Sequence, residues 1–305
     1  MSDRLHHDEV SIDQDLVRRL LKAQLPHLGG LPLRAASAQG TDNVVFRLGA
    51  GLSVRLPRKP SAVGGLMIEL EWLPRLAPSL PLAVPVPVAS GDPSEEYPFP
   101  WTVCTWVSGE PLRPDSGLDV EGAEALAGFV LALESADTCG GPPVKAGERA
   151  GPVAAYDTIV GAAIDGVRAA TAAGRIEPGL VDERAAAEVW TSAMNAPAWE
   201  GPGVWVHRDL LGGNLVVVDG RLTGVLDFGG LAVGDPAGNV MAAFHLLSPE
   251  QQPAFRAALG ADDATWARAR GWALAQGLEA LLYYLDTHPG MVAMARRVIA
   301  ATLSV

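Results

Sequence analysis

One stretch of the chain, residues 204–229, constrains its fold more than any other. An apolar run there ends in a His-x-Asp sequence whose aspartate is Asp209, and Asn214 follows five residues later. Two further apolar runs flank an Asp-Gly pair at 219–220, which is typical of a tight hairpin turn, and the second run ends at Asp227. The pattern predicts two short strands joined by a hairpin. If these strands pair, the three polar side chains converge at one end of the ribbon.

The chemistry of these three side chains indicates a metal and a phosphate. Carboxylate and amide oxygens suit Mg²⁺, which takes one or two carboxylates together with substrate phosphates and water. A His-x-Asp with an asparagine five residues on, followed by Asp-Phe-Gly, is also the phosphoryl-transfer signature of the protein-kinase fold. Each motif alone is weak evidence for this fold, whereas the complete set in this order is a specific signature. The alternative is a surface hairpin with a turn aspartate, a capping asparagine and a solvated aspartate.

Length and composition limit the class of protein. A chain of 305 residues is long enough for two lobes or one large domain, and 49% of hydrophobic residues excludes a disordered chain. The formal net charge of −12 argues against nucleic acid as a partner, because phosphate binding needs basic stripes. An acidic cleft would concentrate a cationic substrate, although ordinary solubility explains the same charge equally well.

The sequence carries no address outside the cytoplasm. The polar N-terminus lacks the charged-then-apolar pattern of a signal peptide, and no run of about 18 apolar residues is available to span a membrane. Cys104 and Cys139 have no metal-ligand spacing and do not make a disulfide framework. We therefore expect a cytoplasmic protein with no membrane partner, in the compartment that supplies ATP and Mg²⁺.

The N-terminal part of the chain is predicted to be mainly a sheet. A capped helix begins near Ser11, and short strands are expected at 31–36, 43–48 and 52–56. The turn at 37–43 is built of small residues. Its backbone N–H groups are able to cover nucleotide phosphates, although a plain hairpin loop fits the turn as well.

In the kinase arrangement, the third strand carries a cation that reaches the phosphates and pairs with a glutamate on the following helix. Arg55 alternates with the apolar residues of this strand, whereas Lys59 lies beyond Pro57 where a strand is disfavoured, so we favour Arg55. Glu69 and Glu71 are the available partners on the helix expected from Ser61 to Leu76. They are two residues apart and cannot share one helix face. The pattern leaves this choice open.

A change of composition marks the boundary between two predicted lobes. The β-branched and aromatic run at 101–107 is the last strand of the first part, and its final residues, Thr105 to Val107, are the expected hinge. From residue 120 onward the pattern is helical apart from the hairpin. We therefore predict an α+β fold of two lobes, a β-rich lobe at 1–107 and a helical lobe at 108–305.

The chain resembles the aminoglycoside phosphotransferase family, small-molecule kinases with a protein-kinase-like fold. The resemblance extends over nearly the whole chain, and its most specific part is the stretch described above. The motifs that carry it are Gly40-Thr41-Asp42-Asn43, Val54-Arg55-Leu56-Pro57-Arg58, Trp72-Leu73-Pro74-Arg75-Leu76, Pro98-Phe99-Pro100-Trp101, His207-Arg208-Asp209 with Asn214, Asp227-Phe228-Gly229 and Gly234-Asp235-Pro236-Ala237.

This resemblance implies a transfer of the γ-phosphoryl group of ATP or GTP to a hydroxyl of a small molecule, such as an aminoglycoside or another antibiotic. Asp209 would accept or orient the hydroxyl proton, with His207 organising the catalytic loop. Asn214 and Asp227 would hold Mg²⁺ on the phosphates. The residues implied to bind the nucleotide are Arg55 paired with Glu69, Gly40, Thr41 and Asn43 over the phosphates, and Thr105 and Val107 through their backbone at the adenine.

Two residues depart from the family pattern. Arg208 stands where small-molecule kinases usually have glycine, and Asn239 stands where the family has an aspartate that braces the catalytic loop. An asparagine still accepts a backbone N–H through its amide oxygen, but without charge assistance. Two alternatives therefore remain, a metabolic kinase acting on a sugar, choline or an amino alcohol, and a nucleotide-binding pseudokinase. The five residues between Gly229 and Asp235 leave no room for the activation loop of a protein kinase.

Overall fold

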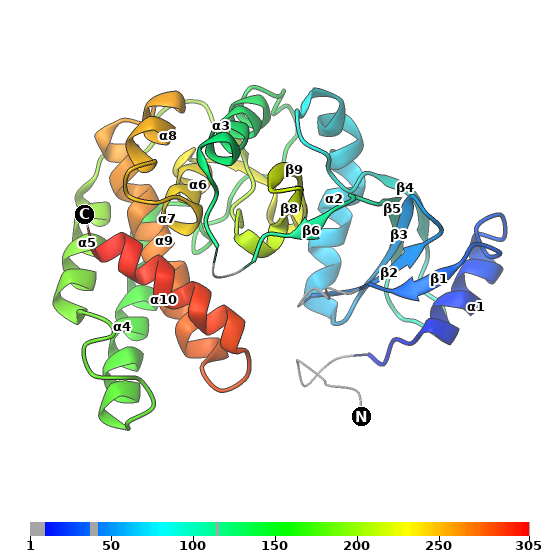
Figure 1. Ribbon diagram of the computed structural model, residues 1–305, viewed down its shortest axis with the longest axis horizontal. Helices are drawn as coiled ribbons and strands as arrows, with labels where there is room; N and C mark the ends of the chain where they lie inside the picture. Colours follow the sequence, from blue (N-terminus) through cyan, green and yellow to red (C-terminus); the bar gives the residue numbers. More distant parts are fainter. Residues whose placement is uncertain (1–9, 37–41, 114–115, 305) are drawn as a thin grey trace. The chain divides into compact units, whose positions relative to one another are not determined.

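The computed structural model describes residues 10–36, 42–113 and 116–304 (Figure 1). Two compact units divide the chain: unit 1 comprises the chain up to Glu110 together with Thr223–Leu231, and unit 2 comprises Pro111–Leu222 and the chain from Ala232. The sequence-based boundary after Val107 lies just before the end of the first stretch. The sequence-based division placed residues 223–231 in the second lobe. In the structure this segment belongs to unit 1, because the backbone oxygen of Ala83 accepts a hydrogen bond from Val225 N and the backbone nitrogen of Ala83 donates to Thr223 O.

Unit 1 is built on a five-stranded antiparallel sheet in the order β1-β2-β3-β5-β4. Its strands and helices are β1 (Leu33–Ala35), β2 (Asn43–Leu48), β3 (Leu52–Pro57), β4 (Pro87–Gly91), β5 (Trp101–Thr105), α1 (Gln14–Gln24) and α2 (Val63–Leu76). The stretch at 81–88, whose prolines favour an extended edge strand or a polyproline segment, joins the sheet only from Pro87. The prolines before that point supply no N–H to a ladder, which explains the late start.

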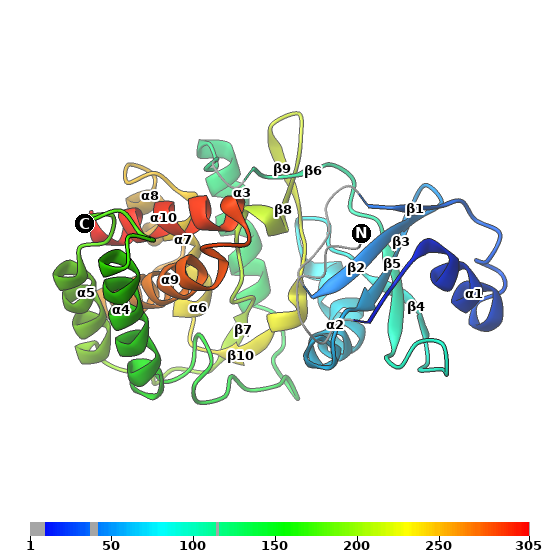
Figure 2. The ribbon, with the colours of Figure 1, turned by 90° about the horizontal axis from the view of Figure 1, so that it is seen from below.

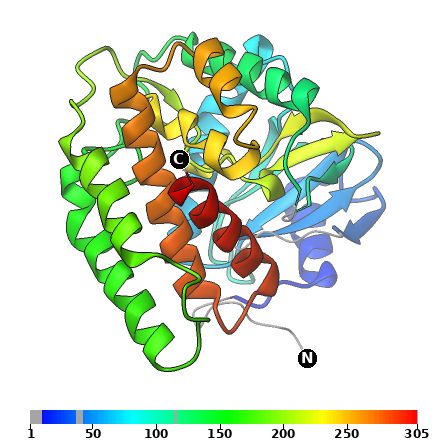
Figure 3. The same cartoon turned by 60° about the vertical axis from the view of Figure 1, so that its left-hand side comes forward.

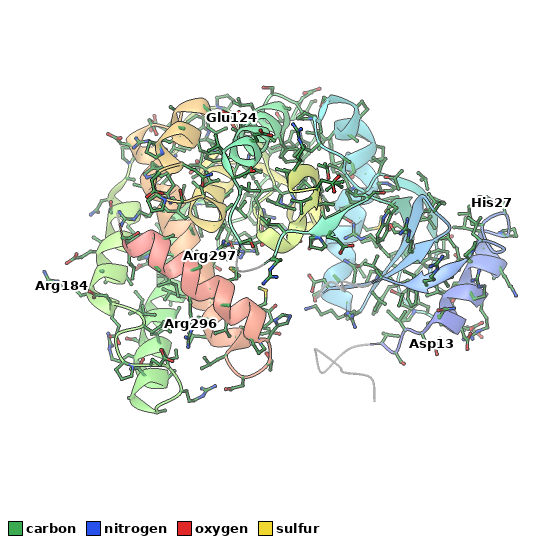
Figure 4. The ribbon with its side chains drawn as sticks, viewed as in Figure 1. Asp13, His27, Glu124, Arg184, Arg296 and Arg297 are labelled. Carbon is green, nitrogen blue, oxygen red and sulfur yellow. The ribbon has the colours of Figure 1, made fainter. Side chains whose placement is uncertain are left out.

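The core of unit 1 lies between α1 and the sheet (Figure 1). Asp13 caps α1 by accepting from the backbone nitrogen of Leu16 at 2.7 Å, and the side chain stands at the start of this helix (Figure 4). The apolar residues of α1 recur at helical spacing and are buried. They pack with alternate residues of β2 and β3, and with Trp101 of β5. This packing fixes the face of β3 that each of its side chains occupies.

The predicted hairpin is present. Strands β8 (Leu215–Val218) and β9 (Arg221–Val225) are joined by Asp219 and Gly220, which both adopt positive φ, at 51° and 80°. Positive φ at both central residues is the requirement of a type I′ turn, and Asp-Gly meets it with little strain. The hairpin belongs to a three-stranded sheet with β6 (Glu110–Pro111), in the order β6-β8-β9, and the boundary of the two units falls within β6 and β9.

The second sheet has two strands, one just before His207 and one shortly after Asp227. β7 (Val204–Val206) pairs antiparallel with β10 (Ala232–Gly234), and the two strands lie side by side in Figure 2. The sequence pattern does not predict β10, a strand of three residues in a segment rich in glycine. β7 leads into His207 with Trp205 and Val206 fully buried, so its packing sets where the following residues begin.

Unit 2 is otherwise helical. Its helices are α3 (Val120–Glu134), α4 (Asp157–Ala172), α5 (Glu183–Asn195), α6 (Ala237–Val240), α7 (Ala242–Leu246), α8 (Gln252–Ala258), α9 (Asp263–Tyr284) and α10 (Pro289–Leu303). The short helices α6 and α7 are separated at Met241. α9 is the central helix and packs against α4, α5, α6 and α10 (Figure 3). Because it is covered on several sides, it is apolar around most of its circumference.

The predicted α+β class is confirmed, with a sheet-rich N-terminal part and a helical C-terminal part. Within the described residues, no helix combines the length and the apolar composition that crossing a bilayer requires.

Candidate active site

In unit 1, Arg55 and Glu69 form a buried ion pair. Arg55 Nη1 lies 2.6 Å from Glu69 Oε2, and the two residues are 8% and 2% exposed. Burial, the largest single effect, lowers the pKa of Arg55, but the charge and hydrogen bond of Glu69 together with the charges of Cys104 and Asp227 outweigh burial, and the pKa is raised. The guanidinium therefore stays charged inside unit 1. This is the strand-to-helix pairing that the sequence predicts, and the nucleotide-binding role of the two residues stays a prediction.

Lys59 and Glu71, the alternative residues for this ion pair, form contacts with other residues. Lys59 Nζ contacts Asp42 Oδ1 at 3.0 Å, outside β3. Glu71 lies 3.8 Å from Arg75 Nη2, and both side chains are more than half exposed, as expected for two residues on the outer face of α2.

The second oxygen of Glu69 connects α2 to the Asp-Phe-Gly turn. Its Oε1 accepts a hydrogen bond from the backbone nitrogen of Phe228 at 2.8 Å. The helix and the turn approach so closely that a Cβ at Gly65 would lie 3.0 Å from the Cα of Gly229, a tight contact that favours glycine at position 65. Asp227, before this turn, has a left-handed backbone at φ 61° and ψ 71°. One glutamate therefore fixes both the Arg55 side chain and the turn that follows Asp227.

In unit 2, Asp209 is held by two amides. Asn214 Nδ2 donates to Asp209 Oδ2 at 3.0 Å and to its backbone oxygen at 2.9 Å, and Gln276 Nε2 donates to Oδ1 at 2.8 Å. Arg149 Nη2 approaches Oδ1 at 3.6 Å. The two neutral amides orient the carboxylate through hydrogen bonds and Arg149 adds a longer charged contact, so the carboxylate is held in place to accept a proton or a hydroxyl hydrogen bond.

The sequence pattern gives no sign of two of these neighbours. Gln276 lies on α9, 67 residues after Asp209, and Arg149 lies in an irregular segment before α4. Neither belongs to a motif. The one feature of the sequence that could have indicated Gln276 is its polarity, because it lies in the apolar middle of a long helix.

His207 is fully buried at the start of the catalytic loop. Its backbone nitrogen donates to Asn239 Oδ1 at 2.9 Å, and its Nδ1 accepts from the backbone nitrogen of Asp209 at 3.3 Å. The side chain thus shapes the loop by a local contact. Asn239 makes the bracing contact that an aspartate would make, as the sequence allowed.

Arg208, the other departure from the family pattern, has a left-handed backbone at φ 67°. Such a conformation favours glycine, and an arginine there bears a cost of about 1 kcal/mol. Its side chain compensates by binding the segment that carries Arg149: Nη1 lies 2.8 Å from Glu148 Oε2 and 3.4 Å from the backbone oxygen of Arg149. The substitution therefore links the catalytic loop to that segment.

The remaining predicted nucleotide contacts lie in unit 1. Gly40 and Thr41 are outside the described residues. Asn43 begins β2 opposite Pro57, and its buried Oδ1 has no hydrogen-bond partner among the described residues. Thr105 ends β5 with its N–H donated to Val86 O at 2.9 Å, and Val107 is buried just beyond. An adenine contact through the N–H of Thr105 is therefore excluded, which leaves its carbonyl oxygen and the backbone of Val107 for the predicted hinge.

The two predicted magnesium ligands fit the ion by their donor chemistry. With its nitrogen turned to Asp209, Asn214 has its amide oxygen as the remaining donor, and Asp227 supplies a carboxylate. No group of three or more His, Cys, Asp or Glu side chains suited to a metal occurs among the residues that the structure describes.

Comparison with protein families decides the identity of the fold. The model of the APH phosphotransferase enzyme family matches residues 34–272, well over half of the chain. The chain belongs to this family. A search of curated proteins found no match.

Solved structures of this family agree over nearly the full length. The GDP complex of wild-type aminoglycoside 2'-phosphotransferase-IIIa is 17% identical, with a TM-score of 0.72, over 96% of this chain and 99% of that chain. The GDP and kanamycin complex of APH(2")-IIIa has 18% identity and a TM-score of 0.67, over 94% and 97%. Macrolide 2'-phosphotransferase MphH from Brachybacterium faecium has 23% identity and a TM-score of 0.58, over 92% and 97%. At these identities the similarity establishes the kinase-like APH fold and leaves the substrate open.

Proposed function

We propose that this APH-family protein transfers the γ-phosphoryl group of ATP or GTP to a hydroxyl of a small molecule, and that the acceptor is an antibiotic. The observation that carries the proposal is the environment of Asp209. Two neutral amides, from Asn214 and Gln276, orient its carboxylate. This is the arrangement that a residue accepting a hydroxyl proton requires.

In the proposed reaction, the substrate hydroxyl donates to Asp209 while its oxygen attacks the γ-phosphorus. The new phosphorus–oxygen bond forms as the bond to the β-phosphate oxygen breaks, the nucleoside diphosphate leaves, and the hydroxyl proton passes to Asp209. Arg55, oriented by Glu69, would bind the phosphates with a charge that it cannot lose near neutral pH. Bound Mg²⁺ would neutralise phosphate charge, held by Asn214 and Asp227. His207 would hold the loop rather than carry a proton.

The choice of an antibiotic acceptor is supported by the nature of the similar structures. They are aminoglycoside and macrolide phosphotransferases, and the complexes include kanamycin with GDP, and streptomycin with ATP. The same names leave the nucleotide open between ATP and GTP. A cationic acceptor would also agree with the net charge of −12.

The test is phosphoryl transfer measured by mass spectrometry. The protein would be incubated with Mg-ATP or Mg-GTP and a panel containing kanamycin, gentamicin, streptomycin, macrolides, simple sugars, choline and amino alcohols. We expect a gain of one phosphoryl group on an antibiotic. Asp209→Asn should abolish it and leave nucleotide binding largely intact. Asp165→Asn, which removes an exposed carboxylate of the same unit, is the matched control.

Each outcome decides between the functions. Phosphorylation of a sugar, choline or an amino alcohol alone would establish the metabolic kinase instead. Nucleotide binding without transfer to any acceptor would indicate a pseudokinase. Transfer by Asp209→Asn at the wild-type rate would refute the role of Asp209.

A further inference from the structure

Asn239 is oriented by three hydrogen bonds in the interior of unit 2. Its Oδ1 accepts from the backbone nitrogen of His207, and its Nδ2 donates to Glu134 Oε1 and to the backbone oxygen of Trp205, each at 2.9 Å. The residue is fully buried. Three of the four hydrogen-bonding capacities of the amide are used, both donors and one of the two acceptor positions.

An asparagine differs from an aspartate at this position because its two ends are different. Rotation of the amide by 180° would set a donor against the N–H of His207, and an acceptor against Trp205 O and Glu134. A carboxylate has no such wrong orientation. Asn239 therefore braces the catalytic loop only while acceptors hold its nitrogen in place.

Glu134 is the side chain among these acceptors, and its position in the chain is otherwise unfavourable. It is the last residue of α3, where a negative charge is repelled by the partial charge of the helix C-terminus. It is also partly buried, and burial raises its pKa to about 7, opposed by the hydrogen bond from Asn239. Helix formation does not explain a glutamate here, whereas the contact with Asn239 does.

We propose that Glu134 is a positioning residue for phosphoryl transfer: it holds the amide of Asn239 in the orientation that fixes His207 and the loop carrying Asp209. The proposal rests on the proposed function for its effect on catalysis, but the contact itself is independent of the substrate. In this chain, the carboxylate that the family has at position 239 is supplied from α3, one hydrogen bond further from the loop.

Four variants separate this role from a general structural one. Glu134→Leu removes the acceptor. Glu134→Gln keeps an oxygen for Asn239 Nδ2. Asn239→Asp sets a carboxylate oxygen against Glu134 and against the backbone oxygen of Trp205, and the double variant Asn239→Asp with Glu134→Gln restores a donor opposite an acceptor between residues 134 and 239. Glu124→Gln is the matched control, because Glu124 lies exposed on the same helix α3 (Figure 4).

The first readout does not depend on activity. In protein labelled with ¹⁵N-histidine, hydrogen exchange of the His207 backbone amide reports its bond to Asn239. We expect exchange to be at least tenfold faster in Glu134→Leu and in Asn239→Asp, and to return toward the wild-type rate in the double variant. Exchange unchanged in Glu134→Leu, or a double variant no better than Asn239→Asp, would overturn the proposal even if no acceptor had been found.

The second readout is the division between kcat and KM for the acceptor identified by the mass-spectrometric test. We expect kcat to fall about tenfold or more in Glu134→Leu and in Asn239→Asp, while KM for the nucleotide stays within about twofold of the wild-type value. The double variant should recover most of the lost kcat. Glu134→Gln and the control should resemble wild type. A loss confined to KM, or equal losses in Glu134→Leu and Glu134→Gln, would refute the positioning role while leaving the proposed function intact.

Discussion

Replacing Glu69 by glutamine should destabilise unit 1 by removing one charge from its interior. Glu69→Gln keeps the shape of the side chain, and its amide oxygen still accepts from the backbone nitrogen of Phe228. What is lost is the negative charge 2.6 Å from the guanidinium of Arg55, which is only 8% exposed and remains charged. The variant thus separates the ion pair from the hydrogen bond to the Asp-Phe-Gly turn.

The expected magnitude follows from the burial of both partners. Removing one member of a buried ion pair leaves an uncompensated charge and typically costs about 3–5 kcal/mol. Because Arg55 retains slight exposure, we expect about 3 kcal/mol, measured as the loss of unfolding free energy in urea. In contrast, Arg55→Met with Glu69→Gln removes both charges and should recover most of this loss. Glu71→Gln removes an exposed charge from α2 and should change stability by less than about 0.5 kcal/mol.

Stability and nucleotide binding should separate in these variants. The double variant is expected to fold well and yet to bind Mg-ATP and Mg-GTP at least tenfold more weakly, because the cation proposed to contact the phosphates is absent. Isothermal titration gives the affinities. The reasoning would be refuted if Glu69→Gln unfolded at the wild-type urea concentration, or if the double variant were no more stable than Glu69→Gln.

Three further perturbations test other contacts of unit 2. Gln276→Leu removes a hydrogen bond to the Asp209 carboxylate, and a hydrogen bond to a charged group is worth about 1.5–3 kcal/mol. Steady-state kinetics should therefore show kcat about 10–100-fold lower, with KM for the nucleotide unchanged. An unaltered kcat would contradict the role of Gln276 in orienting Asp209. The pKa of Glu134 is raised by burial from 4.5 to about 7, so the folded protein binds the extra proton between these values. Unfolding free energy should therefore fall by up to about 3 kcal/mol as pH rises from 4.5 to 7, and urea titrations should show this slope missing in Glu134→Gln. Asp235→Asn breaks the buried pair with Arg268, 2.6 Å apart, and should lower thermal stability markedly; an unchanged melting temperature would show that the pair is not a stabilising contact.

Much of the candidate site could be predicted because its signals are local. The Asp-Gly pair at 219–220 specifies its own turn geometry, and the end of β3 at Pro57 separates Arg55, which lies in the strand, from Lys59, which lies beyond it. Motif order along the chain indicated the family, and the family match then confirmed it. The prolines before β4 left a strand and a polyproline segment as alternatives, and the strand begins only at Pro87.

The sequence by itself determined the hairpin and the class of fold and indicated the residues proposed to carry chemistry, since each of these depends on neighbours within a few positions. Tertiary structure alone decided which partners orient those residues. Gln276 reaches Asp209 across 67 positions and Glu134 reaches Asn239 across 105, and neither contact leaves a periodic or compositional trace. The physical reason is that buried polar groups must find partners wherever the packing of helices places them. Packing against α9 and α3 therefore selects Gln276 and Glu134 from many polar residues that the sequence cannot rank.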